Sequence, residues 1–191
     1  GEIRLEPDFL KEEFVRRYLV DVNPGDTYSH DNLLEIQQDL ISAGYFSLVD
    51  VKPRFRLAEG ANVPVDVSLK AAKRQAFSFG LGYDTDIEFN IRMRWNHRRL
   101  NESGHKADAL VKLSAKESVI RGNYWIPIKD PRTHKLGFSS RLETEETDST
   151  ERLTWDLEGG YYYKWNDWIS KLFTEFKWEP FTAGAEPETN T

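Results

Sequence analysis

Side chains that could carry out catalysis or bind a metal are few and widely spaced in this sequence. There is no cysteine, which excludes a thiol nucleophile, a disulfide framework and a zinc knuckle. The histidines lie far apart, on expected helix and turn segments, without the close spacing of metal ligands: His30, His97, His105 and His134. The sequence therefore predicts no metal site, no cofactor and no enzymatic activity.

The charged residues could at most form binding sites, and none of them indicates catalysis. An acidic run at 143–151 could bind divalent cations or lipopolysaccharide, although a solvated loop is the simpler expectation. Four charged residues, one of them from this run, could line a conduit, with structural ion pairs as the simpler expectation: Arg92, Arg94, Glu143 and Glu158. The net charge of -6, without a basic block, argues against nucleic acid as a partner.

The most regular pattern lies between residues 76 and 97. Apolar side chains alternate there with polar ones: Ile87, Phe89, Ile91, Met93 and Trp95 against Glu88, Asn90, Arg92, Arg94 and Asn96. Because successive side chains of a strand point to opposite faces, this segment has one apolar and one polar face. In a soluble sandwich the apolar face packs on a core. In an outer-membrane barrel it faces lipid, and the polar face lines a wet lumen.

Alternation of this kind predicts antiparallel strands over residues 76–84, 87–97, 105–115, 118–128, 136–145, 152–165 and 168–178. Membrane strands need about 9–11 residues, whereas strands of soluble sheets commonly have about 5–6, so these lengths favour a barrel. Bacterial barrels have an even number of strands, so this set cannot close one. We expect a truncated barrel, cut at both ends, that pairs with another copy through its edges, sits in detergent or folds differently.

The tryptophans also favour the barrel. If the first strand starts on the side of the preceding module, all of them fall near one of two interfaces, as in a membrane girdle: Trp95, Trp125, Trp155, Trp165, Trp168 and Trp178. Near-side turns carry basic residues and the far-side loop carries acidic ones. Basic residues beside an anionic leaflet are favourable by about 1 kcal/mol each. Residues 76–191 are therefore expected to cross an outer-membrane lipid bilayer as transmembrane β-strands.

The first 75 residues predict a different, mixed fold. Their patterns give strand, helix, helix, strand and strand at about 2–5, 9–19, 29–44, 45–55 and 63–69. Ser29 suits the N-cap of the second helix, Gly44 its end, and Pro53 an edge strand or a strand end. Two helices on one face of a short sheet make a small α+β module. It contains no catalytic motif, so we expect a binding or spacer module.

This order of elements, leading directly into girdled strands, resembles the outer-membrane protein assembly superfamily of BamA, TamA and the two-partner secretion transporters. The strings that carry the resemblance are PGDTYS at 24–29, LISAGYF at 40–46, GYDTD at 82–86, WNHRRLN at 95–101 and GH at 104–105. The Gly-Tyr-Phe string is shared by many polypeptide-transport-associated (POTRA) repeats, and the later strings are closest to the TamA-like branch. By this resemblance, residues 1–75 are the last POTRA repeat and residues 76–191 the first part of the barrel.

The resemblance implies a translocation and assembly factor in the outer membrane of a Gram-negative bacterium, with its POTRA module in the periplasm. It would insert or export unfolded β-barrel or autotransporter clients, with an inner-membrane-anchored partner resembling TamB. In this family a client adds a strand to the module's sheet edge by β-augmentation. Here that edge would be Ser47, Leu48, Val49, Asp50, Val51, Lys52 and Pro53. The alternative is an ordinary edge blunted by its proline.

The first barrel strand would form one side of a lateral seam, through Phe77, Phe79, Gly80, Leu81, Gly82 and Tyr83. Its two glycines weaken a strand, which suits a seam that opens; otherwise they are simply small lumen residues. Two other functions stay open. One is the export barrel of a patatin-like phospholipase, whose Gly-x-Ser-x-Gly motif this sequence lacks. The other is a soluble β-rich adhesion or carbohydrate-binding domain.

Overall fold

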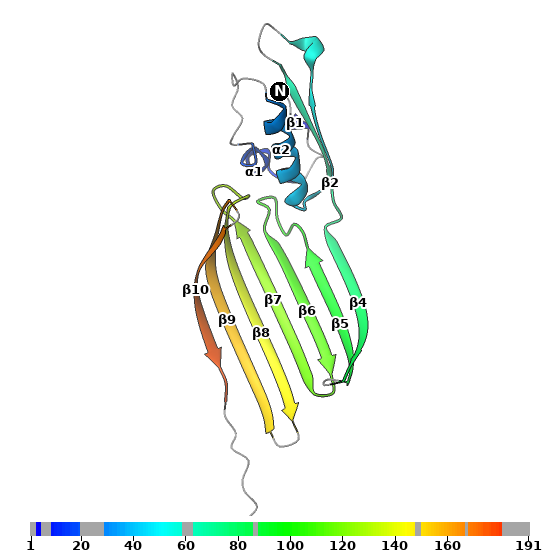
Figure 1. Cartoon of the computed structure of the whole chain (residues 1–191), viewed down its shortest axis with the longest axis vertical. Helices are drawn as coiled ribbons and strands as arrows, with labels where there is room; N and C mark the ends of the chain where they lie inside the picture. Colours follow the sequence, from blue (N-terminus) through cyan, green and yellow to red (C-terminus); the bar gives the residue numbers. More distant parts are fainter. Residues whose placement is uncertain are drawn as a thin grey trace, which may run out of the picture.

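The computed structural model describes residues 3–4, 9–19, 29–58, 63–85, 88–147, 150–166 and 168–180. They form a three-stranded and a seven-stranded sheet, joined where β3 (Val65–Ala71) leads into β4 (Gln75–Asp84). Figure 1 shows the small sheet and its helices standing at one end of the large sheet. No helix among the described residues is long and apolar enough to cross a membrane.

The N-terminal module comprises the described residues before 75. Its elements follow the predicted order: β1 (Ile3–Arg4), α1 (Glu12–Arg16), α2 (His30–Ser42), β2 (Phe46–Pro53), a 3₁₀ turn η1 (Phe55–Leu57) and β3. The central strand is β3, which pairs in parallel with β1 and antiparallel with β2. Because β2 has no second partner strand in the described sheet, it is an edge, as predicted. Residues 24–28, which belong to the first of the quoted strings, lie outside the described residues.

Local chemistry explains where α2 begins and ends. The Ser29 hydroxyl accepts a hydrogen bond from the Asn32 N–H (3.4 Å), and Gly44 takes a φ of +72° just after the helix. The first helix is shorter than the predicted 9–19. It continues as 3₁₀-type turns, in which Tyr18 N–H bonds to the Val15 carbonyl (3.0 Å), and these turns keep the apolar stripe facing inward.

The core of the module lies between the helices and the small sheet. It contains Phe9, Leu10, Phe14, Val15, Tyr18, Ile36, Leu40, Ala43, Tyr45, Phe46, Val49, Val67 and Leu69. Val15 and Leu40 are completely buried. The aromatic members meet edge to face, as Phe14 does with Tyr45 at 5.6 Å between ring centroids.

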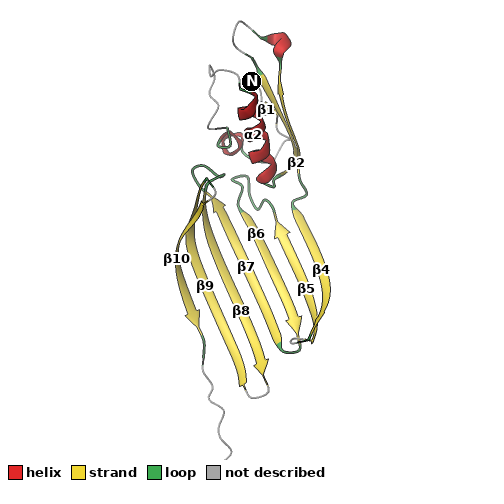
Figure 2. Ribbon diagram, viewed as in Figure 1, coloured by secondary structure: helices red, strands yellow, loops and turns green. Residues whose placement is uncertain are grey.

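The large sheet is an antiparallel meander. Its strands are β4, β5 (Glu88–His97), β6 (Lys106–Ser114), β7 (Glu117–Pro127), β8 (His134–Thr147), β9 (Thr150–Trp165) and β10 (Trp168–Trp178). Each pairs with the next along the chain, so β4 and β10 are the two outer strands and the described sheet is open (Figure 2). The seven predicted strands are confirmed. The acidic run, expected to be a loop, is mostly strand, because the ladder continues to the pair of Thr147 and Thr150.

The pairing register extends the predicted alternation across most of the sheet, although Ile169 and Phe173 of β10 lie on the charged face. Phe79 lies opposite Met93, and Met93 opposite Val111, on one face. Arg92 lies opposite Lys112 on the other face, with Gly80. The large side chains of the apolar face are mostly exposed; Phe79 is 75% exposed and Leu172 77% exposed. The sheet therefore carries one exposed apolar face and one charged face. Ile87 lies outside the described residues.

Five of the tryptophans lie on the apolar face, near the strand ends: Trp95, Trp155, Trp165, Trp168 and Trp178. Trp125, predicted with them in the girdle, lies near the end of β7 but points to the opposite face. Its neighbour Tyr124 occupies the apolar face opposite Phe138, so the next residue along the strand must point to the other face. There the Trp125 indole donates a hydrogen bond to the Asp108 carboxylate (3.2 Å).

Candidate functional site

The edge strand β2 offers backbone groups that no described strand uses. The N–H of Arg54 donates to the Pro64 carbonyl (2.8 Å), which fixes the direction of the backbone at this end of the strand. Since N–H and C=O groups alternate in direction along an antiparallel strand, those of Val49 and Val51 point away from β3. Pro53 points the same way but has no N–H to donate. The predicted docking edge therefore presents a short run of free groups.

A contact with helix α2 occupies one of these free backbone groups. The Gln37 side-chain amide donates a hydrogen bond to the Val49 carbonyl (3.4 Å). At the start of the strand the pairing shifts between Phe46 and Leu48, and the Ser47 hydroxyl bonds to the Ala71 carbonyl (2.9 Å). Val51 is thus the position in the described edge where both backbone groups are available. Of the predicted docking residues, it has the geometry best suited to strand addition.

The other predicted edge, β4, carries its two glycines on the charged face. A β-carbon at Gly80 would meet no atom within 4 Å, whereas one at Gly82 would lie 3.0 Å from the Asn90 side-chain oxygen. Asn90 is buried, and this oxygen has no hydrogen-bond partner in the described structure. Gly82 therefore makes room for Asn90, while the space at Gly80 is open. The predicted seam side chains on the opposite face are exposed: Phe77, Phe79, Leu81 and Tyr83.

Ion pairs account for part of the charged face. Glu158 pairs with Lys171 (2.5 Å) and accepts a hydrogen bond from the Tyr162 hydroxyl (2.9 Å), and Glu143 pairs with Arg141 (2.6 Å). The expectation of structural pairing is confirmed for these two carboxylates. The described residues contain no group of three or more acidic or histidine side chains able to hold a metal ion.

The N-terminal module is fixed to the large sheet by specific contacts near the ends of β5 and β6. The Tyr45 hydroxyl donates to the Gly104 carbonyl (2.5 Å), and Gly104 has a φ of +76°. A β-carbon at Gly104 would lie 2.2 Å from the Phe14 ring, so only glycine fits. The Arg99 guanidinium lies 4.2 Å from the centre of the Phe9 ring. Burial raises the pKa of Tyr45, so its phenol remains a donor.

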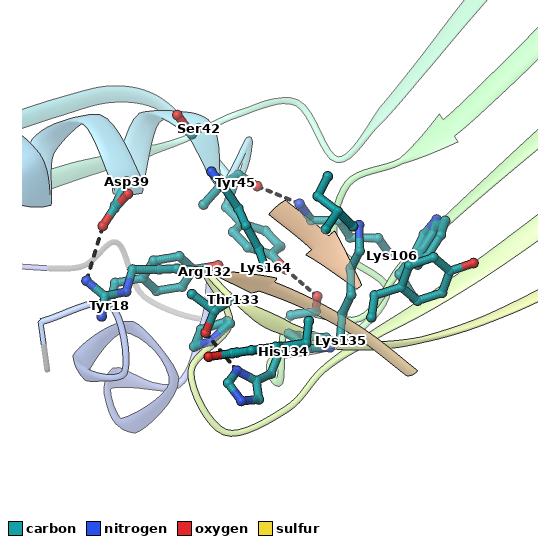
Figure 3. Close-up of a pocket in the computed structure, with 18 residues that line it drawn as sticks. Tyr18, Asp39, Ser42, Tyr45, Lys106, Arg132, Thr133, His134, Lys135 and Lys164 are labelled. Carbon is teal, nitrogen blue, oxygen red and sulfur yellow. Dashed lines mark hydrogen bonds and ion pairs between the residues drawn. The ribbon is translucent and has the colours of Figure 1, made fainter. Parts of the chain in front are cut away.

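A second set of contacts lies at the end of α2. Arg132, in the turn between β7 and β8, pairs with Asp39 of α2 (3.2 Å) and with Asp130 (2.7 Å). Lys106 donates to the Ala43 carbonyl (2.5 Å) and lies 4.2 Å from the centre of the Tyr45 ring. These contacts border a cavity of about 310 Å³ between the module and the charged face of the sheet (Figure 3). We call it the junction cavity.

The fold matches a solved structure. The crystal structure of BamA from Haemophilus ducreyi lacking POTRA domains 1-3 superposes with a TM-score of 0.72 and 15% sequence identity. The match covers 92% of this chain and 34% of that one, so this chain spans about a third of the neighbour's length. No family model matches the sequence. The chain therefore has a BamA-like fold, in which the seven-stranded sheet of the described residues is open.

The junction residues were not selected from the sequence. Near-side basic residues were expected beside an anionic leaflet, but Arg132 binds two carboxylates of the protein and Lys135 lies 4.5 Å from the centre of the Trp125 ring. The one local signal was Gly104, at the end of the predicted turn 101–104. Its contact with Phe14, 90 positions earlier in the printed sequence, follows from tertiary packing.

Proposed function

We propose that this chain is part of an outer-membrane protein-assembly factor of the BamA–TamA type. The observation that carries the proposal is the exposed apolar face of the seven-stranded sheet, opposite a charged face. Large apolar side chains in this number are rarely left in water, and a membrane covers them without a second protein layer. The BamA-like fold supports the same proposal.

The N-terminal module then acts as a periplasmic POTRA module, and the strings at 82–86, 95–101 and 104–105 favour the TamA-like branch. Its role is binding without catalysis. Unfolded β-barrel or autotransporter clients pair with Val51 on the β2 edge and with the open edge of β4, and a TamB-like protein delivers them. A free copy of the chain can also pair with itself through β4 and β10, whose outer edges have no partner in the described sheet.

A test of the membrane assignment uses the absence of native cysteine. Single cysteines at Ile91 and Arg92, adjacent residues on opposite faces of β5, receive a nitroxide label after insertion into lipid vesicles. We expect the Ile91 label to be relaxed by oxygen, which concentrates in lipid, and the Arg92 label by a water-soluble nickel chelate. Labels at Met93 and Arg94 should repeat this alternation.

The control is Lys52→Cys, on the exposed part of β2, whose label should be relaxed more strongly by the nickel chelate than by oxygen. If the labels at Ile91 and Met93 were relaxed only by the water-soluble reagent, the apolar face would not contact lipid. The assembly-factor proposal would then lose its physical basis, and a soluble β-rich protein would be the better assignment.

A further inference from the structure

The junction cavity concentrates basic side chains in a chain whose net charge is -6. Lys106 of β6, Lys135 of β8 and Lys164 of β9 all line it, together with Arg132. Figure 3 shows these side chains around one space below the end of α2. Three different strands therefore each contribute a lysine to the lining of one cavity.

Nearby carboxylates do not neutralise these lysines. Asp39 and Asp130 are both paired with Arg132. Glu158 is paired with Lys171, and Asp108 accepts hydrogen bonds from Asn123 (2.6 Å) and Trp125. Within the described part of the chain, the three lysines form no ion pair. Lys106 and Lys135 are instead held by aromatic rings: Lys106 by Tyr45, and Lys135 by Trp125 and by Tyr162 at 5.5 Å.

The aromatic contacts position these ammonium groups without using up their charge. A cation over an aromatic face is attracted by the electrons of the ring and keeps its capacity to donate hydrogen bonds elsewhere. Gly137 supports this arrangement, because a β-carbon there would lie 2.5 Å from the Trp125 ring and 2.8 Å from the Tyr162 ring. The two rings, whose centroids are 5.2 Å apart, can therefore pack beside Lys135 only because residue 137 is a glycine.

We propose that the junction cavity binds a phosphate group through Lys106, Lys135 and Lys164. A phosphate offers three strong acceptor oxygens and up to two negative charges, which suits a cavity lined by three lysines without an ion pair better than a carboxylate does. The volume of about 310 Å³ lies at the lower end of small-molecule sites, enough for a free phosphate or a small phosphate ester. Trp125, Pro127 and Tyr163 provide apolar wall for the organic part of an ester.

The test uses the whole chain folded in an uncharged detergent, with binding measured by titration calorimetry at physiological salt. The ligands are inorganic phosphate, glycerol 3-phosphate and short-chain phosphatidylglycerol. We expect saturable binding to one site. The double variant Lys135→Gln/Lys164→Gln should weaken binding about tenfold or more, because each removes a charge-assisted hydrogen bond. Lys135→Arg, which retains the charge, should restore most of the affinity lost in Lys135→Gln.

The matched control is Lys177→Gln, on the same charged face near the far end of β10, where Lys177 pairs with Glu179 (2.9 Å). It should leave the affinity unchanged. Tighter binding of phosphatidylglycerol than of both soluble ligands would identify a lipid head group as the ligand. Binding of inorganic phosphate as tight as that of phosphatidylglycerol would identify a free anion. Both results would support the site. The absence of saturable binding of all three ligands, or an equal loss of affinity in Lys177→Gln, would overturn it.

Discussion

The Nζ atom of Lys106 lies 2.5 Å from the carbonyl oxygen of Ala43, so the first residue of β6 holds the end of α2. The last carbonyls of a helix have no partner within the helix, and a cation there satisfies one of them and complements the helix dipole. With the pairs Tyr45–Gly104 and Arg132–Asp39, this contact fixes the N-terminal module to the large sheet at several points. The junction is therefore a specific interface between the N-terminal module and the large sheet.

The first prediction concerns Gly104. Gly104→Ala should destabilise the junction, because alanine is strained at a φ of +76° and its β-carbon would enter the Phe14 ring. We expect a loss of about 1–3 kcal/mol in the free energy of unfolding, measured by urea titration in detergent. Gly122→Ala, where a β-carbon meets no atom within 4 Å, is the control and should change stability far less. Equal effects of the two substitutions would argue against the junction.

The second prediction separates the two glycines of β4. Gly80→Ala should be neutral or stabilise the strand by up to about 1 kcal/mol, because the space around it is open and alanine restricts the unfolded chain. Gly82→Ala should cost about 1–3 kcal/mol, because its β-carbon crowds the buried Asn90. The comparison uses the same urea titration. If Gly80→Ala alone impaired client insertion while stability rose, Gly80 would have the role expected of a seam that opens.

The third prediction tests the β2 edge. Val51→Pro removes the N–H that points away from β3, so crosslinking of an unfolded β-barrel client to a photoreactive group at Leu48 should fall about fivefold or more. Gln37→Ala frees the Val49 carbonyl and should increase the same crosslinking. Asp50→Ala, at a residue whose backbone faces β3, is the control. If neither Val51→Pro nor Gln37→Ala changed the crosslinking of the client, the edge would not dock clients.

Sequence reasoning predicted the elements well because strand alternation is a local property. The period of two between Phe89 and Trp95 needs no knowledge of distant residues, and the register carries it across most of the sheet. It did not decide between Tyr124 and Trp125, adjacent aromatic residues that cannot share a face. The choice between them depends on Asp108 and Gly137, which accept the indole on the charged face.

The candidate site was predicted only in part, for a similar reason. Pro53 marked the β2 edge locally, but the role of Gln37 at that edge depends on how α2 packs over β2. The junction cavity had no local signal, because Lys106, Lys135 and Lys164 come together only through strand pairing. A periodic pattern does not predict contacts between residues far apart in the chain, even where each residue lies in a correctly predicted element.

The last prediction concerns pH and Asp130. Burial raises the pKa of this carboxyl, but the hydrogen bonds and charge of Arg132 outweigh it and hold the pKa below its ordinary value. A lowered carboxyl pKa stabilises the folded state above the unfolded value of about 3.9, and this stabilisation is lost as the pH falls through the folded pKa. Asp130→Asn should therefore lower the urea midpoint at neutral pH, and its difference from the parent should shrink below about pH 4. Asp50→Asn, which affects only the exposed pair with Lys52, should show little difference at either pH. A difference for Asp130→Asn that stayed constant on acidification would mean that the substitution acts through packing, and that the charge of Asp130 does not hold Arg132 against Asp39.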